Sequence, residues 1–398
     1  MSQQTLEDGG TRHLPIPTRE EILGAARSLV PSLKERAHDA MLRRCVPQET
    51  IADFQRTKLF RIAQPARFGG FEFDWTIHCE VSEILSEADG SQAWIQGIMA
   101  NHAHMLGTFP LEAQEDVWGH DPSQLISASF EPKGRARRHG DGYLLTGTYR
   151  FASGIDHADW LICGGFVESD DGSPQGPHFF LIPKHEAEVD DDWFTLGLQG
   201  TGSKSFRIRD VKVPGHRMLD GEQARVGEAA GTRVNTNHVY RTPRGGVTAT
   251  GFAAMCTGMA KSVLEEWLAF SGPRRQRTDQ AWAQAGHLML TAEAAVKIDA
   301  ARDLYLGTIE RTMKRVRSGA RADDLELMTA RRNVSYCCKL AFEAGTILFH
   351  AAGGSALFEN QRIAQQYRNL MAASAHFAVA WDVHAPAWTD QLLKARKA

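Results

Sequence analysis

The sequence contains no long apolar run and almost no excess of charge of one sign. No stretch reaches the 18 or more apolar residues that indicate a membrane-spanning helix. The net charge of −3, with 23% charged residues, argues against partners held by bulk electrostatics, such as nucleic acids or membrane surfaces. Residues 1–10 are polar and lack the basic-then-apolar pattern of a secretory leader. We therefore expect a cytoplasmic protein that binds neither nucleic acid nor membrane.

C-x-x-C pairs and the common catalytic motifs are absent as well. The six cysteines are scattered without a C-x-x-C pair, so we expect reduced thiols and no metal site. No G-x-G-x-x-G joins a strand to a helix, and neither H-E-x-x-H nor G-x-S-x-G occurs. The glycine-rich stretch 197–205 resembles a phosphate-binding loop but lacks a lysine directly after the second glycine. These absences exclude a nicotinamide site of the Rossmann type.

Three regions of different periodicity divide the chain. Residues 1–123 predict a helical domain, because a capping box at Thr18 and Glu21 precedes apolar residues at helical spacing. Residues 124–220 predict a β domain, with strands at 125–130, 143–151, 160–167, 179–182 and 206–213. Residues 221–398 predict a four-helix bundle, with helices at 249–270, 280–317, 325–352 and 363–381. The fold class is therefore α+β: a helical domain, a β-barrel or sandwich, and a four-helix bundle.

Four segments, in this order and at plausible spacing, resemble the acyl-CoA dehydrogenase superfamily. They are residues 127–132, 149–154, 200–214, and 352–355 taken with 367–369. The resemblance extends over residues 19–388, nearly the whole chain. It implies a flavin placed between the β domain and the helices.

The last of the predicted helices separates two chemistries within this superfamily. Acyl-CoA dehydrogenases place a glutamate there, which abstracts a proton next to the thioester carbonyl, a step worth orders of magnitude in rate. Residues 368–382 contain no glutamate, and Ser374 to His376 stand where the base would fall. This segment and residues 151–160 are instead similar to the oxygenase components of group D two-component flavin monooxygenases. That group includes phenol, hydroxyphenylacetate and steroid-ring hydroxylases.

The resemblance implies an enzyme with a defined set of partners. Reduced FMN, or FADH2, would come from a separate NAD(P)H:flavin reductase and react with O2 to a C4a-hydroperoxide. That species would hydroxylate a small phenolic or other electron-rich aromatic substrate in a homotetramer. Three alternatives stay open: oxygenation of nitrogen or sulfur on the same scaffold, an acyl-CoA dehydrogenase with a displaced base, and a flavin-fold assembly partner without activity.

The same resemblance assigns catalytic roles to three residues. Ser153 is expected at flavin N5, where its hydroxyl protects the hydroperoxide. His376 is expected to protonate the oxygen that leaves, because an unperturbed histidine titrates near neutral pH. His102, favoured over His104, is expected to accept the proton of a phenol whose pKa is near 10.

The remaining predicted flavin contacts come from all three regions. The resemblance assigns flavin binding to Trp94, Ser127, Ser129, Phe151, Ala152, Gly354, Ser355 and Phe377 in addition to Ser153 and His376. Arg274, chosen over Arg275 and Arg277, is expected to pair with the flavin phosphate through its forked guanidinium. Residues 240–246, which connect the β domain to the bundle, are predicted to line the substrate pocket.

Overall fold

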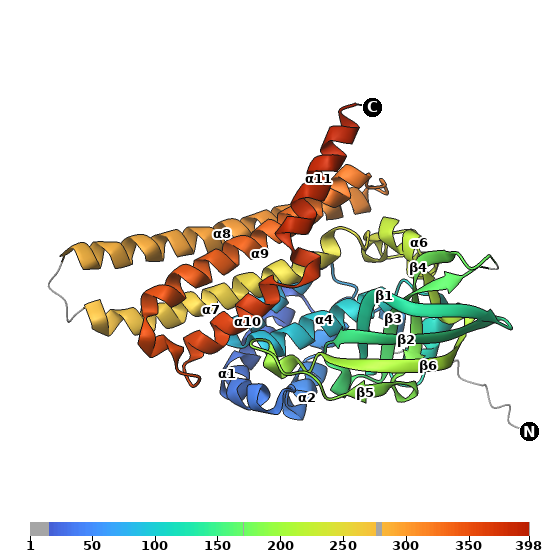
Figure 1. The fold of residues 1–398 in the computed structure, drawn as a ribbon, viewed down its shortest axis with the longest axis horizontal. Helices are drawn as coiled ribbons and strands as arrows, with labels where there is room; N and C mark the ends of the chain where they lie inside the picture. The colour runs from blue at the N-terminus through green and yellow to red at the C-terminus, as the bar shows by residue number, and fades with distance from the viewer. Residues whose placement is uncertain (1–15, 170, 276–280, 398) are drawn as a thin grey trace, which may run out of the picture.

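The computed structural model describes residues 16–169, 171–275 and 281–397, and its elements follow the order helices, sheet, helices (Figure 1). The predicted capping box is confirmed: the Thr18 hydroxyl accepts from the Glu21 N–H, and the Glu21 carboxylate accepts from the Thr18 N–H. Aspartates cap two further helices of the N-terminal region, Asp74 before α3 and Asp89 before α4. The N-terminal helices are α1 (Arg19–Arg43), α2 (Gln48–Arg56), α3 (Trp75–Ala88), α4 (Gly90–Leu106) and α5 (Leu111–Trp118).

The middle of the chain forms one seven-stranded sheet in the order β5-β6-β2-β1-β3-β4-β7. Its strands are β1 (Ile126–His139), β2 (Gly142–Ala152), β3 (Trp160–Glu168), β4 (Pro174–Pro183), β5 (Glu188–Asp190), β6 (Lys204–Pro214) and β7 (Met218–Asp220). β1 pairs with β3 in parallel, and the other described pairs are antiparallel. β1 continues well past the predicted end at Phe130, because its charged second half pairs with β2 across a tight turn at Gly140, whose φ is +61°.

The C-terminal region packs α7 (Thr250–Arg275), α8 (Ala281–Arg317), α9 (Asp324–Ala352) and α10 (Arg362–Ser374) side by side (Figure 1). The short helix α6 (Gly221–Val226) leads into this bundle, and α11 (Trp381–Ala395) packs on α9. Among the helices of the described ranges, none is both long and apolar enough to cross a membrane.

The single helix predicted at 363–381 is wrong, since α10 ends at Ser374 and α11 begins only at Trp381. His376 causes the break. Its backbone is extended, with ψ of 135°, and its ring nitrogen Nδ1 accepts the Ala378 N–H at 3.1 Å. A side chain that satisfies a backbone donor in this way caps a new 3-10 turn, η11 (Phe377–Val379), and stops the helix.

Helix α4 joins the parts of the molecule. It contacts β1 on one side and α7 and α10 on another, and Figure 1 shows it between the sheet and the bundle. One apolar core passes through all three regions, including Trp94 of α4, Tyr149 of β2 and Met255 of α7. Side chains of α4, β2 and the α10–α11 connection therefore meet where the sheet approaches the bundle.

Candidate active site

The turn that follows β2 is held in an unusual backbone conformation. Phe151 has a φ of +61°, a left-handed value that is uncommon outside glycine, and its side chain is 61% exposed. Two residues later the Ser153 N–H donates to the Phe151 carbonyl at 2.9 Å. Gly154 has a φ of +72°, and a Cβ there would meet the Met99 methyl at 2.6 Å. Strain of this kind persists where surrounding structure fixes the chain, and it clusters at functional sites.

The Ser153 hydroxyl is the centre of a buried hydrogen-bond network. Trp94 Nε1 donates to Ser153 Oγ at 3.1 Å, and the Ser203 hydroxyl lies 2.8 Å from the same oxygen. Ser203 in turn contacts the Thr201 hydroxyl at 2.7 Å. Sequence reasoning missed Ser203, since a serine in a glycine-rich loop has no distinguishing spacing. The network fixes the direction of the Ser153 oxygen.

Two further predicted residues support this turn from β1. Ser127 Oγ donates to the Ser153 carbonyl and Ser129 Oγ donates to the Arg150 carbonyl, each at 2.8 Å. Their protons are therefore committed to the β2 turn, and only their oxygen lone pairs are left for another partner. Ala152, also predicted, is fully buried.

An aromatic wall stands beside Ser153. Phe252, near the start of α7, stacks on the His376 ring with centroids 4.6 Å apart and an interplanar angle of 24°. Trp94 contacts both rings, with centroid distances of 5.1 Å to Phe252 and 5.7 Å to His376. Phe252 was another residue that the sequence did not single out, because its spacing is that of an ordinary core residue. The structure thus brings together Trp94, Ser153 and His376.

The His376 ring is oriented by the main chain. A backbone N–H can only donate, so the bond from Ala378 N requires an unprotonated Nδ1, and the neutral ring carries its proton on Nε2. Burial lowers the pKa of His376 to about 4, so the neutral form is the one present at pH 7. Nε2 has no hydrogen-bond partner among residues of the described ranges. Phe377, by contrast, is 71% exposed and is not part of the wall.

His102 has the opposite arrangement. Its Nδ1 lies 2.9 Å from the Ile126 carbonyl, which can only accept, so Nδ1 carries the proton and Nε2 is an acceptor. Burial, above all, lowers the pKa of His102 to about 4. His104 instead donates Nε2–H to the Val239 carbonyl at 2.8 Å and stacks on Tyr240 at 5.6 Å. Its ring is thereby used in packing, whereas Nε2 of His102 has no partner among the residues that the structure describes.

Three of the predicted flavin contacts lie away from this cluster within one chain. Gly354 and Ser355 precede α10, whereas His376 follows it, and a helix of 13 residues is about 20 Å long. Arg274 and Arg275 are in the last turn of α7, at the opposite end from Phe252. Arg277 lies outside the described residues. The predicted end of this helix at 270 is also wrong, because α7 continues to Arg275.

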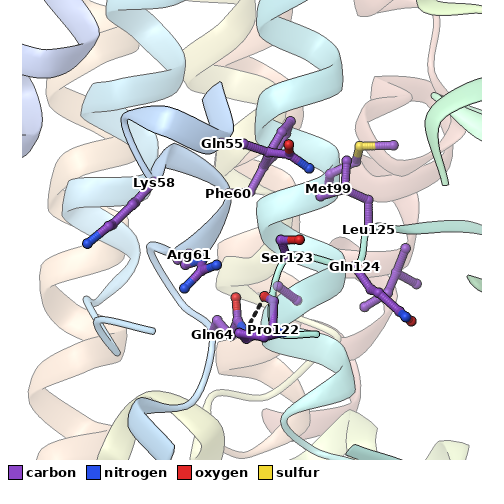
Figure 2. Close-up of a pocket in the computed structure, with 12 residues that line it drawn as sticks. Gln55, Lys58, Phe60, Arg61, Gln64, Met99, Pro122, Ser123, Gln124 and Leu125 are labelled. Carbon is purple, nitrogen blue, oxygen red and sulfur yellow. Dashed lines mark hydrogen bonds between the residues drawn. The ribbon is translucent and has the colours of Figure 1, made fainter. Parts of the chain in front are cut away.

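Figure 2 shows the residues that line a cavity between α2, the following loop and α4. The volume of this cavity is about 20 Å³. Gln55, Lys58 and Arg61 line one side, and Met99 and Leu125 line the other. A cavity of this size holds about one water molecule. It is therefore too small to be the binding site of an aromatic substrate.

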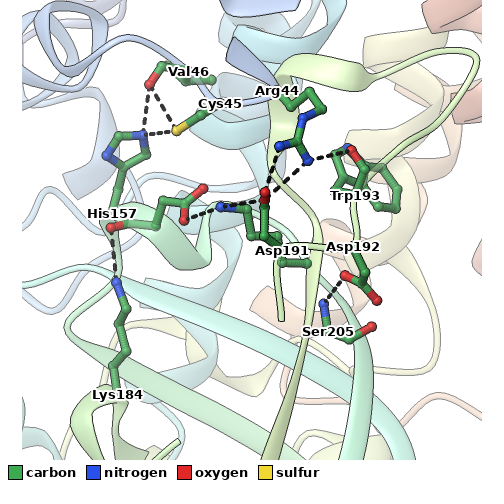
Figure 3. Close-up of polar contacts among 11 residues, drawn as sticks. Arg44, Cys45, Val46, His157, Lys184, Asp191, Asp192, Trp193 and Ser205 are labelled. Carbon is green, nitrogen blue, oxygen red and sulfur yellow. Dashed lines mark hydrogen bonds and ion pairs between the residues drawn. The ribbon is translucent and has the colours of Figure 1, made fainter. Parts of the chain in front are cut away.

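A polar cluster lies between the end of α1, the turn after β2 and the start of β6 (Figure 3). Arg44 forms an ion pair with Asp191 at 2.7 Å, and Lys204 forms one with Asp156 at 2.8 Å. Cys45 lies 3.3 Å from the His157 ring, but burial raises the pKa of its thiol to about 12, so it is not a thiolate. The cluster therefore holds the Ser153 turn against β6 and is not a nucleophilic site.

Comparison with known proteins gives a likeness over nearly the full length. Residues 250–381 match the family described as "Acyl-CoA dehydrogenase, C-terminal domain". The chain is 32% identical over 366 residues to the flavin-dependent monooxygenase oxygenase subunit HsaA of Mycobacterium tuberculosis, covering 90% of this chain and 92% of that one. It is 28% identical over 385 residues to the oxygenase component of an FADH2-dependent resorcinol hydroxylase of a Rhizobium species, covering 93% and 94%. The crystal structure of M. tuberculosis HsaA matches with a TM-score of 0.90 and 31% identity, covering 95% and 98%.

Proposed function

Since the chain belongs to the oxygenase subunits of flavin-dependent monooxygenases with the acyl-CoA dehydrogenase fold, we propose that it hydroxylates a phenolic or other electron-rich aromatic compound with reduced flavin and O2. One observation carries the proposal. With no partner among the described residues, Nε2 of His102 is an acceptor and Nε2–H of His376 is a donor, so one chain supplies both a proton acceptor and a proton donor. Hydroxylation of a phenol requires both.

The residues around Ser153 fit a flavin. A flat ring system needs an apolar wall and hydrogen-bonding groups along its edge. Trp94, Phe252 and His376 supply the wall, and the Ser153 hydroxyl with the adjoining backbone supplies the edge. A reduced flavin, when bound, supplies the two electrons with which one atom of O2 is reduced to water while the other enters the substrate. Ser153 is proposed to contact N5, and the network with Trp94 and Ser203 holds it there.

Each histidine has one task in this scheme. Nε2 of His102 accepts a hydrogen bond from the phenol hydroxyl. With a pKa near 4 against about 10, complete transfer before reaction costs roughly 8 kcal/mol, so the proton moves as the oxygen atom attacks the ring. Nε2–H of His376 donates to the departing oxygen. Because His376 is neutral at pH 7, its Nε2–H first donates a hydrogen bond to the departing oxygen and only then transfers its proton.

The electron supply and the assembly complete the proposal. A separate NAD(P)H:flavin reductase delivers reduced FMN, with FADH2 as the alternative, because the sequence carries no nicotinamide fingerprint. A homotetramer is supported by exposed apolar side chains beside α10, namely Leu357, Phe358 and Phe377. Gly354, Ser355 and Arg274 are proposed to reach the flavin of a neighbouring subunit.

Isotope labelling tests the proposal. The protein, a flavin reductase, NADH and FMN are incubated under ¹⁸O2 with a panel of phenols, and products are analysed by mass spectrometry. We expect one ¹⁸O atom in a hydroxylated product. Bleaching of a tightly bound oxidised flavin by an acyl-CoA without oxygen, and no labelled product, would instead identify a dehydrogenase.

A further inference from the structure

Within the described ranges, the guanidinium of Arg244 has no acidic partner. Among residues 16–169, 171–275 and 281–397, no carboxylate forms an ion pair with it and its N–H groups make no hydrogen bond. The guanidinium lies over Phe130 of β1 and Phe179 of β4, whose rings are perpendicular to each other, with Cζ 4.3 Å and 4.2 Å from the ring centroids. Cation–π contacts orient a guanidinium but leave its five donors unsatisfied.

A second cation adds to the positive charge. Arg331 of α9 donates Nε–H to the Gly245 carbonyl at 2.5 Å and likewise has no acidic partner in the part of the chain that the structure describes. Burial first, and the charge of Arg331 second, lower the pKa of Arg244 to about 9. Unpaired charges in desolvated positions are costly unless an opposite charge joins them.

Arg244 is not fully covered by the protein. The residue keeps intermediate exposure, although the surrounding protein desolvates its guanidinium.

Arg244 also faces the same region as His102. The Phe130 ring that carries the guanidinium on one side meets the His102 ring edge-on, with centroids 5.4 Å apart. The two residues are close enough that the charge of Arg244 lowers the pKa of His102. A ring lying along Phe130 would therefore have the acceptor Nε2 of His102 and the unpaired guanidinium within reach of different substituents.

We propose that Arg244, assisted by the charge of Arg331, binds a carboxylate on the aromatic substrate, so that the substrate is a hydroxyaryl carboxylic acid. The inference rests on the proposed hydroxylation and names its substrate class. A planar guanidinium matches a carboxylate with two parallel hydrogen bonds. Contact with two perpendicular phenyl rings holds the guanidinium in position. The carboxylate fixes the substrate's orientation and leaves the hydroxyl at His102.

Binding to the flavin-free protein tests the inference separately from activity. Calorimetry compares 4-hydroxybenzoate, 4-hydroxyphenylacetate and 3-(4-hydroxyphenyl)propanoate, each with its primary amide. We expect at least one acid to bind roughly 10- to 100-fold more tightly than its amide, as charge-assisted hydrogen bonds imply. If no acid of the series exceeds its amide, the inference is overturned.

Variants test whether Arg244 is the group that prefers the acid over the amide. Arg244→Met keeps a long side chain against the two rings but removes the charge, and should abolish the preference for the acid by lowering acid affinity far more than amide affinity. Arg244→Lys keeps the charge without the fork and should restore part of the preference. Arg332→Met is the matched control, because Arg332 of α9 makes a similar cation–π contact, 4.1 Å from the Trp388 ring centroid. Equal loss for acid and amide in Arg244→Met would show a merely structural role and overturn the inference.

The outcomes separate the two proposals. Labelled hydroxylation of neutral phenols, with no preference for acids, removes the carboxylate inference and keeps the proposed function. No labelled product from either class removes the proposed function itself. If Arg244→Met does not fold, the acid-to-amide comparison on the unaltered protein and on Arg244→Lys decides.

Discussion

His102 and His376 are held in opposite tautomers by main-chain partners. The Ile126 carbonyl accepts from Nδ1–H of His102, whereas the Ala378 N–H donates to Nδ1 of His376. Each ring therefore presents Nε2 in a different form, as an acceptor in His102 and as a donor in His376. The burial that lowers both pKa values to about 4 keeps both rings neutral at pH 7. Two residues of one type thereby present opposite hydrogen-bonding groups at Nε2.

Replacing His102 with asparagine should remove the proton acceptor at Nε2 but keep a hydrogen bond to the Ile126 carbonyl. The amide of Asn in His102→Asn can still donate to the Ile126 carbonyl but offers nothing at the Nε2 position. We expect product formation to fall roughly 10²- to 10⁴-fold while O2 consumption continues, as the loss of a general base implies. Product and hydrogen peroxide are measured together. His104→Asn is the control and should lower stability more than turnover. Equal turnover of both variants would remove His102 from the chemistry.

Replacing His376 should uncouple O2 consumption from hydroxylation. His376→Gln places an N–H near the former Nε2, whereas His376→Asn places one only near Nδ1. We expect the Asn variant to release most consumed oxygen as hydrogen peroxide and the Gln variant to recover part of the coupling. The ratio of product to NADH consumed measures this. Unchanged coupling in both variants would contradict the donor role.

The sequence predicted the fold better than it predicted the details of the site. Long periodic helices and alternating strands were located because burial imposes their spacing. The break after Ser374 was missed, since it depends on a histidine that caps a turn and not on glycine or proline. The second half of β1 was missed because its charged residues alternate only with Gly134 and Ala136, which are too small to give a clear apolar pattern.

Sequence reasoning singled out residues of the candidate site only where a motif marked them. Ser153, His102 and His376 stood in recognisable segments, but nothing in the spacing of Ser203 or Phe252 separated them from loop and core residues. Arg244 lay in a segment predicted to line the pocket, yet its unpaired charge depends on what other strands and helices bring near it. Such an absence of partners is a property of the folded structure alone.

Removing the Ser153 hydroxyl should destabilise the protein, and it tests whether this hydroxyl contacts the flavin. In Ser153→Ala the buried Trp94 N–H loses its acceptor, which costs about 1–3 kcal/mol of unfolding free energy. We also expect more hydrogen peroxide per NADH consumed. Ser203→Ala is matched, because it shortens the same network but leaves the bond from Trp94 to Ser153. If both variants release peroxide equally, network rigidity and not a Ser153 contact controls coupling.

Acid should destabilise the fold through buried histidines. Burial lowers the pKa of His78, His102 and His104 to about 4, below the ordinary value of 6.5. Between these values the unfolded chain binds protons that the folded chain does not, so stability falls as pH falls through this window. Each histidine contributes a slope of roughly 1 kcal/mol per pH unit.

His78→Phe gives the sharpest measurement of this effect. The ring contacts Trp75 edge-on at 5.1 Å, and its Nδ1 has no hydrogen-bond partner among the described residues, so a phenyl ring keeps the packing and loses no bond there. Urea unfolding at about pH 7, 6 and 5 gives the unfolding free energy as a function of pH. Its slope should be roughly 1 kcal/mol per pH unit smaller in this variant than in the unaltered protein. Stability at pH 7 should change little or rise, because no buried polar atom is left unpaired. A variant whose stability keeps the full pH slope would show that His78 is protonated in the folded state.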